Sequence, residues 1–374
     1  MSLQFDDTEY LQKLRQLPNA QLHIHWDGSI PFEDLFNFYK KQGKEIPTPD
    51  QDLQGNPVPK IETLEQLHQF RDGLFSKYDI VDVFKIPTMA MQTAEDLKTM
   101  AIAHCQYLSR QNTFYAETRF APWYHTQEAG RGSALTLSQV IGHALEGFEL
   151  GRQNWGATVR PIICINRETS PENAEKIVRA ALEFQDDGVV GIDLACYEPP
   201  FPPELFRRAY ELTFDSELMR TVHADEMVSQ TEGRRNLYTS LVALRANGIG
   251  HGIHLHRFPD LLELMAAWNV RHESNPISNV TCASATHITN PADLHLDKVM
   301  EAGVNVTINA DDPAMWPNGD PAHNLYVVGK LYGDRFVEAV LRKAIDSAWG
   351  MSELEKEHHH QLLTKNLKAY GFRQ

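Results

Sequence analysis

The chain has 374 residues, of which 42% are hydrophobic and 23% are charged, and this composition is typical of a globular protein with a large core. Acidic side chains outnumber basic ones by 50 to 35, so the formal net charge is −15 and no basic surface is expected for polymeric nucleic acid. The four cysteines form no C-x-x-C pair, no apolar run is long enough to cross a membrane, and the polar N-terminus does not resemble a signal peptide. We therefore expect a cytoplasmic protein with neither a disulfide framework nor a thiolate metal site.

Strand-like apolar runs alternate along the chain with longer segments of helical periodicity. Segments 95–110, 171–185 and 203–213 are examples of the predicted helices. This alternation is typical of parallel βα units, and eight such units predict a single (β/α)8 TIM barrel over residues 1–374. The eight predicted strands are 20–26, 113–120, 158–165, 189–194, 219–223, 246–250, 269–273 and 304–309.

The connection after the first strand, residues 31–95, is unusually long. It contains four prolines between 47 and 59 and then an apolar helical pattern over 64–75. A long insertion at the top of a barrel often forms a lid or a pocket wall. An extra packed helix is the alternative, and the two interpretations are compatible.

The first candidate site residues are His23 and His25, at the end of the first predicted strand. Residues i and i+2 of a strand point to the same side, so the two imidazoles face together. Such a pair is a common start of a metal site. A buried, hydrogen-bonded histidine pair is the alternative.

Two further histidines also end predicted strands. His223 is followed three residues later by Glu226, an arrangement that suits metal-assisted acid–base chemistry. His251 lies between Gly250 and Gly252, which allow close approach of the backbone to a ligand. The alternatives are a solvated carboxylate at a helix start and a surface histidine in a turn.

A pair of carboxylates, Asp311 and Asp312, follows the last predicted strand. Adjacent carboxylates at the end of a buried strand are costly without a cation or hydrogen-bond donors. Asp312 precedes Pro313, so a helix N-cap is an alternative for Asp312 but does not explain Asp311.

All four clusters fall at the carboxyl ends of predicted strands, which is the face where barrel enzymes place their catalytic residues. Three imidazoles and a carboxylate suit Zn²⁺ with an open position for water. Bound Zn²⁺ lowers the pKa of its water to about 7.

In the order and spacing of these clusters, the chain resembles the adenosine deaminase-like branch of the amidohydrolase superfamily. The similarity extends over most of the sequence. The motifs that carry it are PNAQLHIHWDGSI at 18–30, YAETRFAP at 115–122, GIDLACYE at 191–198, HADE at 223–226, GHGIHL at 250–255, SNPISN at 274–279 and NADDP at 309–313.

The resemblance implies hydrolytic deamination of an aminopurine by a barrel with one Zn²⁺ per chain. Glu226 is then the residue that donates a proton to the purine ring nitrogen N1. His251 would orient and deprotonate the zinc-bound water with the help of Asp311, and the products would be ammonia and a 6-oxopurine. The implied metal ligands are His23, His25, His223 and Asp311.

The resemblance also implies a set of residues around the substrate. Asp27 is expected to meet a ribose hydroxyl, Gly28 to leave room for the ring, and Asp312 to hydrogen-bond to purine N7, which requires a proton on one partner. His25 borders the substrate as well as the metal. These expectations favour a nucleoside, because adenine-specific relatives often carry Glu at the position of Asp27.

Two positions depart from the family pattern. The family usually has H-A-G-E where this chain has Asp225 within HADE, and a glycine where it has Cys196. The family glycine within H-A-G-E is expected to offer its backbone N–H to purine N3, and Asp225 keeps that N–H but adds a carboxylate near the pocket. The carboxylate either points to solvent or selects a substrate with an extra donor or positive group.

The expected function is therefore zinc-dependent deamination of adenosine or a modified adenosine, with a small-molecule partner only. Free adenine and a modified nucleotide are alternative substrates, and amide or ester hydrolysis is a more distant reaction. A zinc-binding protein without catalysis is the alternative of a different class. The cytidine-type zinc deaminases are excluded because the chain lacks their C-x-x-C. The oligomeric state is not predicted.

Overall fold

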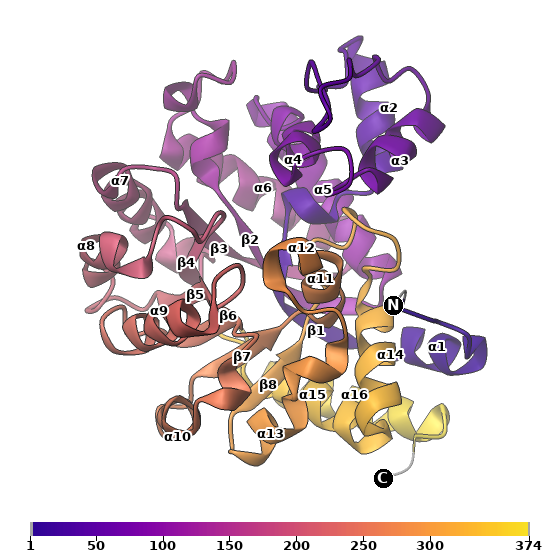
Figure 1. Ribbon diagram of the computed structural model, residues 1–374, viewed down its shortest axis with the longest axis vertical. Coiled ribbons are helices and arrows are strands. Elements are labelled where there is room, and N and C mark those ends of the chain that lie inside the picture. The colour runs from indigo at the N-terminus through magenta and orange to yellow at the C-terminus, as the bar shows by residue number, and fades with distance from the viewer. Residues whose placement is uncertain (1–2, 373–374) are drawn as a thin grey trace.

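The structure, a computed structural model that describes residues 3–372, is built around one sheet of eight parallel strands in the order β1 to β8. The ends of the sheet meet where the backbone of Asp311, just after β8, pairs with β1. The His25 N–H donates to the Asp311 carbonyl at 2.9 Å, and the Asp311 N–H donates to the His23 carbonyl at 3.1 Å. Figure 1 shows the strands at the centre with helices around them. The predicted (β/α)8 barrel is confirmed.

Each strand lies within about three residues of its predicted position, and almost every side chain in the strands is buried. Most strands contain a short apolar run, whereas β7 consists of the polar residues Arg271–Ser274. The strands pair in parallel along the whole series. Their bounds are β1 Asn19–His25, β2 Thr113–Phe120, β3 Thr158–Asn166, β4 Gly191–Ala195, β5 Met219–Ala224, β6 Gly248–His251, β7 Arg271–Ser274 and β8 Asn305–Ile308.

Helices cover the outside of the barrel, and many begin at an N-cap side chain such as Thr136 or Ser229. The predicted helix over 171–185 ends at Leu182, ahead of a short 3-10 turn, and the one over 203–213 is a 3-10 turn followed by a five-residue helix. The helices of the barrel are α1 Thr8–Arg15, α5 Ala94–Arg110, α6 Leu137–Trp155, α7 Pro171–Leu182, α8 Arg207–Glu211, α9 Gln230–Val242, α10 Pro259–Ala267, α11 Pro276–Thr281, α12 Ala283–Thr286, α13 Leu296–Glu301, α14 Pro321–Tyr332, α15 Asp334–Asp346 and α16 Glu353–Ala369.

The insertion after β1 contains three helices, α2 Phe32–Gln42, α3 Leu64–Asp72 and α4 Ile80–Met89, which lie together at one side of the barrel in Figure 1. The Tyr39 hydroxyl donates to the carbonyl of Ile86 at 2.7 Å and joins α2 to α4. The expectation of packed helices is therefore met. That the insertion moves as a lid stays a prediction.

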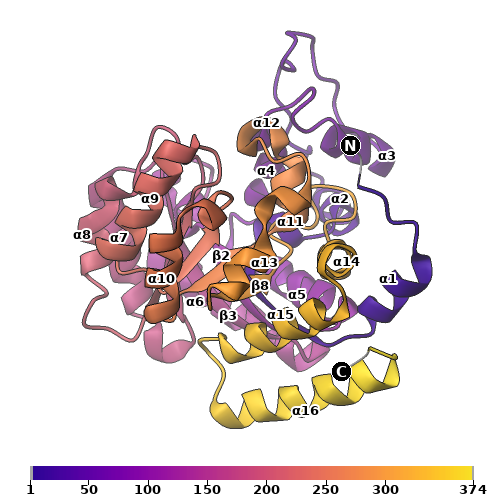
Figure 2. The same cartoon turned by 60° about the horizontal axis from the view of Figure 1, so that its bottom comes forward.

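The remaining helices complete the outer layer. In Figure 2, α16 runs along the edge of the molecule beside α15, and α14 lies near α1. The main hydrophobic core joins the strands to this helical layer. None of the helices in residues 3–372 combines the length and the apolar character needed to cross a lipid bilayer.

Candidate active site

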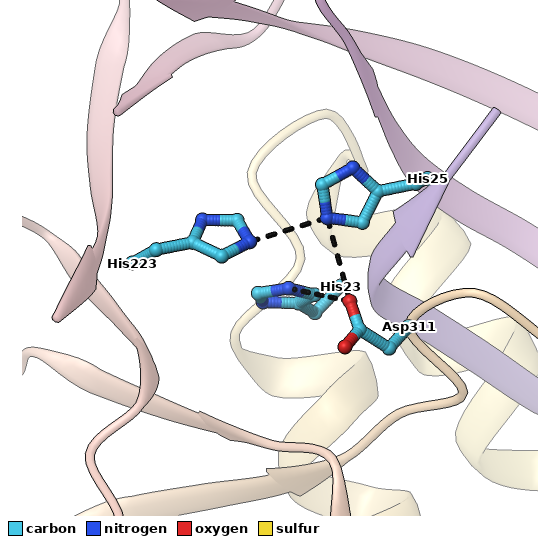
Figure 3. Close-up of side chains that lie close together, drawn as sticks. All are labelled: His23, His25, His223 and Asp311. Atoms are coloured by element: carbon cyan, nitrogen blue, oxygen red, sulfur yellow. Dashed lines mark hydrogen bonds and ion pairs between the residues drawn. The ribbon is translucent and has the colours of Figure 1, made fainter. Parts of the chain in front are cut away.

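Four side chains from three strand ends meet at the carboxyl-terminal mouth of the barrel, as Figure 3 shows. His23 and His25 come from β1, His223 from β5, and Asp311 from the segment after β8. The Nε2 atoms of His25 and His223 are 3.2 Å apart, and Asp311 Oδ1 lies 3.1 Å from His23 Nε2 and 3.4 Å from His25 Nε2. One ligand atom from each residue lies within 4.8 Å of the others.

Two buried carboxylates orient the imidazoles from behind. Glu273 Oε2 is 2.9 Å from His23 Nδ1, and Asp193 Oδ2 is 3.0 Å from His223 Nδ1. A carboxylate beside Nδ1 favours the tautomer with a hydrogen there, which leaves the Nε2 lone pair free as a ligand. Both Nε2 atoms are thus directed to the same centre.

The buried guanidinium of Arg119 lies between these carboxylates. It donates to Asp193 Oδ2 at 2.7 Å and to Glu273 Oε2 at 2.8 Å. Burial alone would raise the pKa of Glu273, but Arg119, Arg271 and His23 hold that pKa well below its ordinary value. The acceptors behind the histidines therefore stay ionised.

The donor set fits a divalent cation. His23 Nε2 and Asp311 Oδ1 are buried, and neither makes a hydrogen bond within the described part of the chain. Unpaired buried polar atoms are costly, and a cation bound by both would remove that cost. Three imidazole nitrogens and one carboxylate oxygen are a ligand set that suits Zn²⁺.

Beside this centre, Glu226 Oε1 lies 3.6 Å from His251 Nε2, which in turn is 4.0 Å from Asp311 Oδ2. Burial, followed by the negative charges of Asp311 and Glu198, raises the pKa of Glu226 well above its ordinary value. Burial also lowers the pKa of His251 well below its ordinary value. Both shifts favour the uncharged forms of the carboxyl and the imidazole, which face each other next to the candidate metal ligands, and this arrangement suits proton transfer.

Three side chains for which no catalytic role was predicted hold His251 and Asp311 in place. Asn279 lies 3.1 Å from His251 Nδ1, and His272 Nε2 lies 2.7 Å from the His251 carbonyl oxygen. The Ser278 hydroxyl donates to Asp311 Oδ2 at 2.7 Å. Ser278 and Asn279 belong to the SNPISN motif, which was their only signal in the sequence.

Glu198 holds the segment that carries Glu226. Its carboxylate accepts hydrogen bonds from the backbone N–H groups of Asp225, Glu226 and Met227 at 2.9–3.2 Å, and from the Asn236 side chain at 2.7 Å. Sequence reasoning missed Glu198, although it ends the GIDLACYE motif. Its position next to this backbone depends on the pairing of β4 and β5.

The structure shows a reason for glycine at position 28 that was not expected, and room for the purine ring at Gly28 stays a prediction. A Cβ at this position would lie 1.7 Å from Asp312 Oδ1, so glycine here makes room for the Asp312 carboxyl. The N-cap interpretation of Asp312 is wrong, because the next helix, α14, begins at Pro321 and is capped by Asp320. Burial and then the Asp311 charge raise the pKa of Asp312 well above its ordinary value.

Asp27 lies in the 3-10 turn that follows β1, and its carboxyl is buried. Burial raises the pKa of Asp27 above its ordinary value. Asp27 Oδ1 and Asp312 Oδ1 have no hydrogen-bond partner in residues 3–372. Each carboxyl therefore has a buried oxygen that lacks a hydrogen bond, which a bound ligand could supply.

The two departures from the family pattern are both in left-handed backbone, with φ 61° at Asp225 and 75° at Cys196. The solvent-facing interpretation of Asp225 is wrong, since its side chain is fully buried and contacts His254. Its backbone N–H donates to Glu198 and is not free for a purine. Cys196 Sγ lies 3.6 Å from the Tyr124 hydroxyl.

Comparisons with known proteins agree with this geometry. The adenosine deaminase family model matches residues 18–368. An adenosine deaminase of Enterococcus faecalis is 31% identical over 300 residues, which cover 80% of this chain and 82% of that relative. An adenine deaminase of Schizosaccharomyces pombe is 28% identical over 363 residues, which cover 96% of this chain and 93% of that relative.

A solved structure has the same fold. An amidohydrolase from Burkholderia ambifaria, determined with bound zinc, superimposes with a TM-score of 0.78 at 18% identity and covers 99% of this chain and 95% of its own. The family match spans nearly the whole chain, including every strand end that contributes to the site. The protein therefore belongs to the adenosine deaminase family.

Proposed function

We propose that this protein is a zinc-dependent deaminase that converts a 6-aminopurine nucleoside, adenosine or a modified adenosine, to the 6-oxopurine and ammonia. The single observation that carries the proposal is the position of Glu226. Its buried carboxyl, with a raised pKa, lies 3.6 Å from His251 and beside the three imidazoles and one carboxylate that suit a cation. A protonated acid next to a metal centre is the requirement for activating a purine toward water.

His23, His25, His223 and Asp311 would hold one Zn²⁺, which when bound supplies a water of lowered pKa and polarises it for attack. Glu226 gives its proton to N1 of the purine, which makes C6 electrophilic. The water adds its oxygen to C6, and the proton that it loses passes to His251 Nε2. That proton then goes to the departing amino group, which leaves as ammonia. The proton left on the new C6 hydroxyl returns to the Glu226 carboxylate as the 6-oxopurine forms, so one water is consumed and Glu226 is protonated again.

The neighbours of His251 support its role as the base. Burial keeps the imidazole neutral by lowering its pKa. Asn279 Nδ2 lies 3.1 Å from Nδ1, and with the amide turned by 180° its oxygen would take this place and accept the Nδ1 hydrogen. Nε2 is then free to accept a proton on the side that faces Glu226 and Asp311.

The unpaired carboxyls support the assignment of a purine nucleoside. Burial and the Asp311 charge raise the pKa of Asp312 and so favour its protonated form, which is the form that donates a hydrogen bond to an acceptor such as purine N7. Asp27 offers a buried oxygen without a partner to a ribose hydroxyl. Free adenine is the second candidate, because the relative from Schizosaccharomyces pombe is named an adenine deaminase.

Release of ammonia from adenosine, adenine and adenosine monophosphate, and of methylamine from N6-methyladenosine, tests the proposal together with zinc content. Glu226→Gln is expected to keep zinc and to lower kcat about 1000-fold, because an amide does not donate the proton. In the parent, kcat is expected to fall as pH rises through the raised pKa of Glu226, since only the protonated acid acts.

Glu263→Gln, on the exposed face of α10, is the matched control and should leave both zinc content and kcat unchanged. Near-normal turnover in Glu226→Gln would overturn the assignment of the acid. Faster turnover of adenine than of adenosine would select the second candidate.

A further inference from the structure

The segment that carries Glu226 is fastened by three residues outside the catalytic set: Asp225, Gly233 and His254. We infer that these residues form a positioning unit that holds Glu226 against His251, and that Asp225 acts through this contact rather than by touching substrate. The inference rests on the proposed function for the role of Glu226. The contacts themselves are independent of any substrate.

The Asp225 carboxylate is saturated by one neighbour. Asp225 Oδ1 lies 2.7 Å from His254 Nδ1, and Oδ2 accepts a hydrogen bond from the His254 backbone N–H at 2.7 Å. The Asp225 side chain is fully buried, whereas that of His254 is 16% exposed. A carboxylate bound at both oxygens by one residue fixes the direction of that residue as well as its distance.

This contact joins the loop after β5 to the loop after β6. The backbone supports the same connection, since the N–H groups of Gly252 and Ile253 donate to the carbonyls of Ala224 and Asp225, both at 3.0 Å. Glu226 lies on the first loop, and His251 ends β6 just before the second. Fastening the two loops therefore sets the separation of the two groups that exchange protons.

The loop after β5 is held from its other side as well. The Glu198 carboxylate accepts hydrogen bonds from the N–H groups of Asp225, Glu226 and Met227, so the backbone at Glu226 lies between an acceptor in the segment after β4 and the contact with His254. Asp225 is in the left-handed conformation, and its backbone N–H donates to Glu198 while its side chain contacts His254. Residue 225 thus links the segments that follow β4, β5 and β6.

Gly233 is the third member of the unit, because a larger residue at this position would leave no room for the Asp225 carboxylate. It lies within α9, where glycine is disfavoured relative to alanine and no positive φ is present. A Cβ at this position would lie 1.8 Å from Asp225 Oδ1 and 2.6 Å from its Cγ. The helix therefore lacks a side chain where the Asp225 carboxylate needs room, which ties these two positions of the sequence together.

A double-variant comparison separates this role from the others. Gly233→Ala is expected to lower both Tm and kcat in the parent, because the new methyl collides with the Asp225 carboxylate. In the Asp225→Gly background the collision is gone, and the same substitution should raise Tm, since alanine is the better helix former. Gly142→Ala in α6 is the matched control, because its Cβ would make only ordinary contacts of 3.6 Å or more.

The kinetic variants test positioning. Asp225→Gly and His254→Ala are each expected to lower kcat about tenfold with little change in KM, and to do so for every aminopurine that is turned over. His254→Asn should recover most of the loss, because its side-chain amide places a donor near the position of Nδ1. The double variant Asp225→Gly/His254→Ala should be no slower than either single variant.

If Gly233→Ala changes Tm equally in the parent and in the Asp225→Gly background, the proposed positioning unit is wrong. A change confined to KM or to substrate preference in Asp225→Gly, with unchanged kcat, would instead give Asp225 a substrate-selecting role and overturn positioning. Since the Tm measurement needs no turnover, it stays decisive even if no aminopurine is deaminated, and failure of the proposed function is thereby distinguished from failure of this inference.

Discussion

His104 illustrates how single buried residues support the mouth of the barrel without taking part in chemistry. It lies in α5, with Nδ1 2.6 Å from the Ser29 hydroxyl and Nε2 2.9 Å from the Thr118 hydroxyl. Ser29 ends the turn that contains Asp27 and Gly28, so His104 connects that turn to β2. Burial lowers the pKa of His104 to about 3.

This lowered pKa predicts an acid-dependent loss of stability. The unfolded chain takes up the His104 proton below pH ~6.5, whereas the folded chain resists it down to about 3, so this contribution is complete above pH ~6.5 and is lost as pH falls through that window. His104→Gln should reduce the fall in unfolding free energy between pH 6 and pH 5 by about 1 kcal/mol. Urea unfolding at both pH values measures it, with His143→Gln on the surface of α6 as control. Parallel curves for the parent and His104→Gln would contradict the prediction.

At the scale of elements, the site depends on the turns after the strands more than on the strands themselves. Asp225, His251 and Asp311 each follow or end a strand with positive φ, between 60° and 65°. Such backbone is costly for residues other than glycine, and it persists only where neighbouring contacts hold it. The Glu198 carboxylate supplies those contacts for the turn after β5 by accepting three consecutive N–H groups.

Glu198→Gln is therefore expected to weaken this turn. One carboxylate oxygen becomes an amide nitrogen that faces N–H donors, and buried donors are left without an acceptor, at a cost of about 1–3 kcal/mol in unfolding free energy. We expect kcat to fall about tenfold or more, since Glu226 shifts with its backbone. Glu301→Gln, exposed in α13, is the control. Unchanged Tm and kcat in Glu198→Gln would show that the turn holds its shape without this carboxylate.

At the scale of the whole molecule, the candidate ligands come from β1, β5 and the segment after β8, which lie far apart in sequence. The segment after β8 pairs with β1, whereas β5 is four strands away in the sheet. A cation bound by these residues would cross-link the barrel at its mouth. It would also offset the negative charge of Asp311. The neighbouring carboxylates, Asp193 and Glu273, form ion pairs with Arg119 and Arg271. Metal binding and the stability of the barrel are thus expected to be linked.

Removal of zinc with a chelator should accordingly lower Tm, and readdition should restore it. A ligand present at about 1000 times its dissociation constant stabilises the folded state by about 4 kcal/mol. His25→Ala removes the most exposed of the four ligands and should abolish most of the difference between the metal-loaded and chelated forms. Differential scanning calorimetry with metal analysis measures this, and identical Tm values with and without chelator would contradict it.

The sequence by itself determined the barrel and the ends of its strands. Strand and helix periodicities are local properties, and parallel strands bring their carboxyl ends to one face, so His23, His25, His223 and Asp311 were predicted to meet before their distances were known. Glu226 and His251 followed from the same reasoning and from the family resemblance.

Only the tertiary structure decided what surrounds these residues. Asp193 and Glu273 behind the histidines, Glu198 beneath Glu226, and the pairing of Asp225 with His254 depend on contacts between separate strands. No local pattern encodes such contacts, since each depends on which side chains the closed barrel brings within a few ångströms. For the same reason, the sequence indicated that Gly28 belongs to the site. It did not indicate that Gly28 makes room for the carboxyl of Asp312, which lies far away in the sequence.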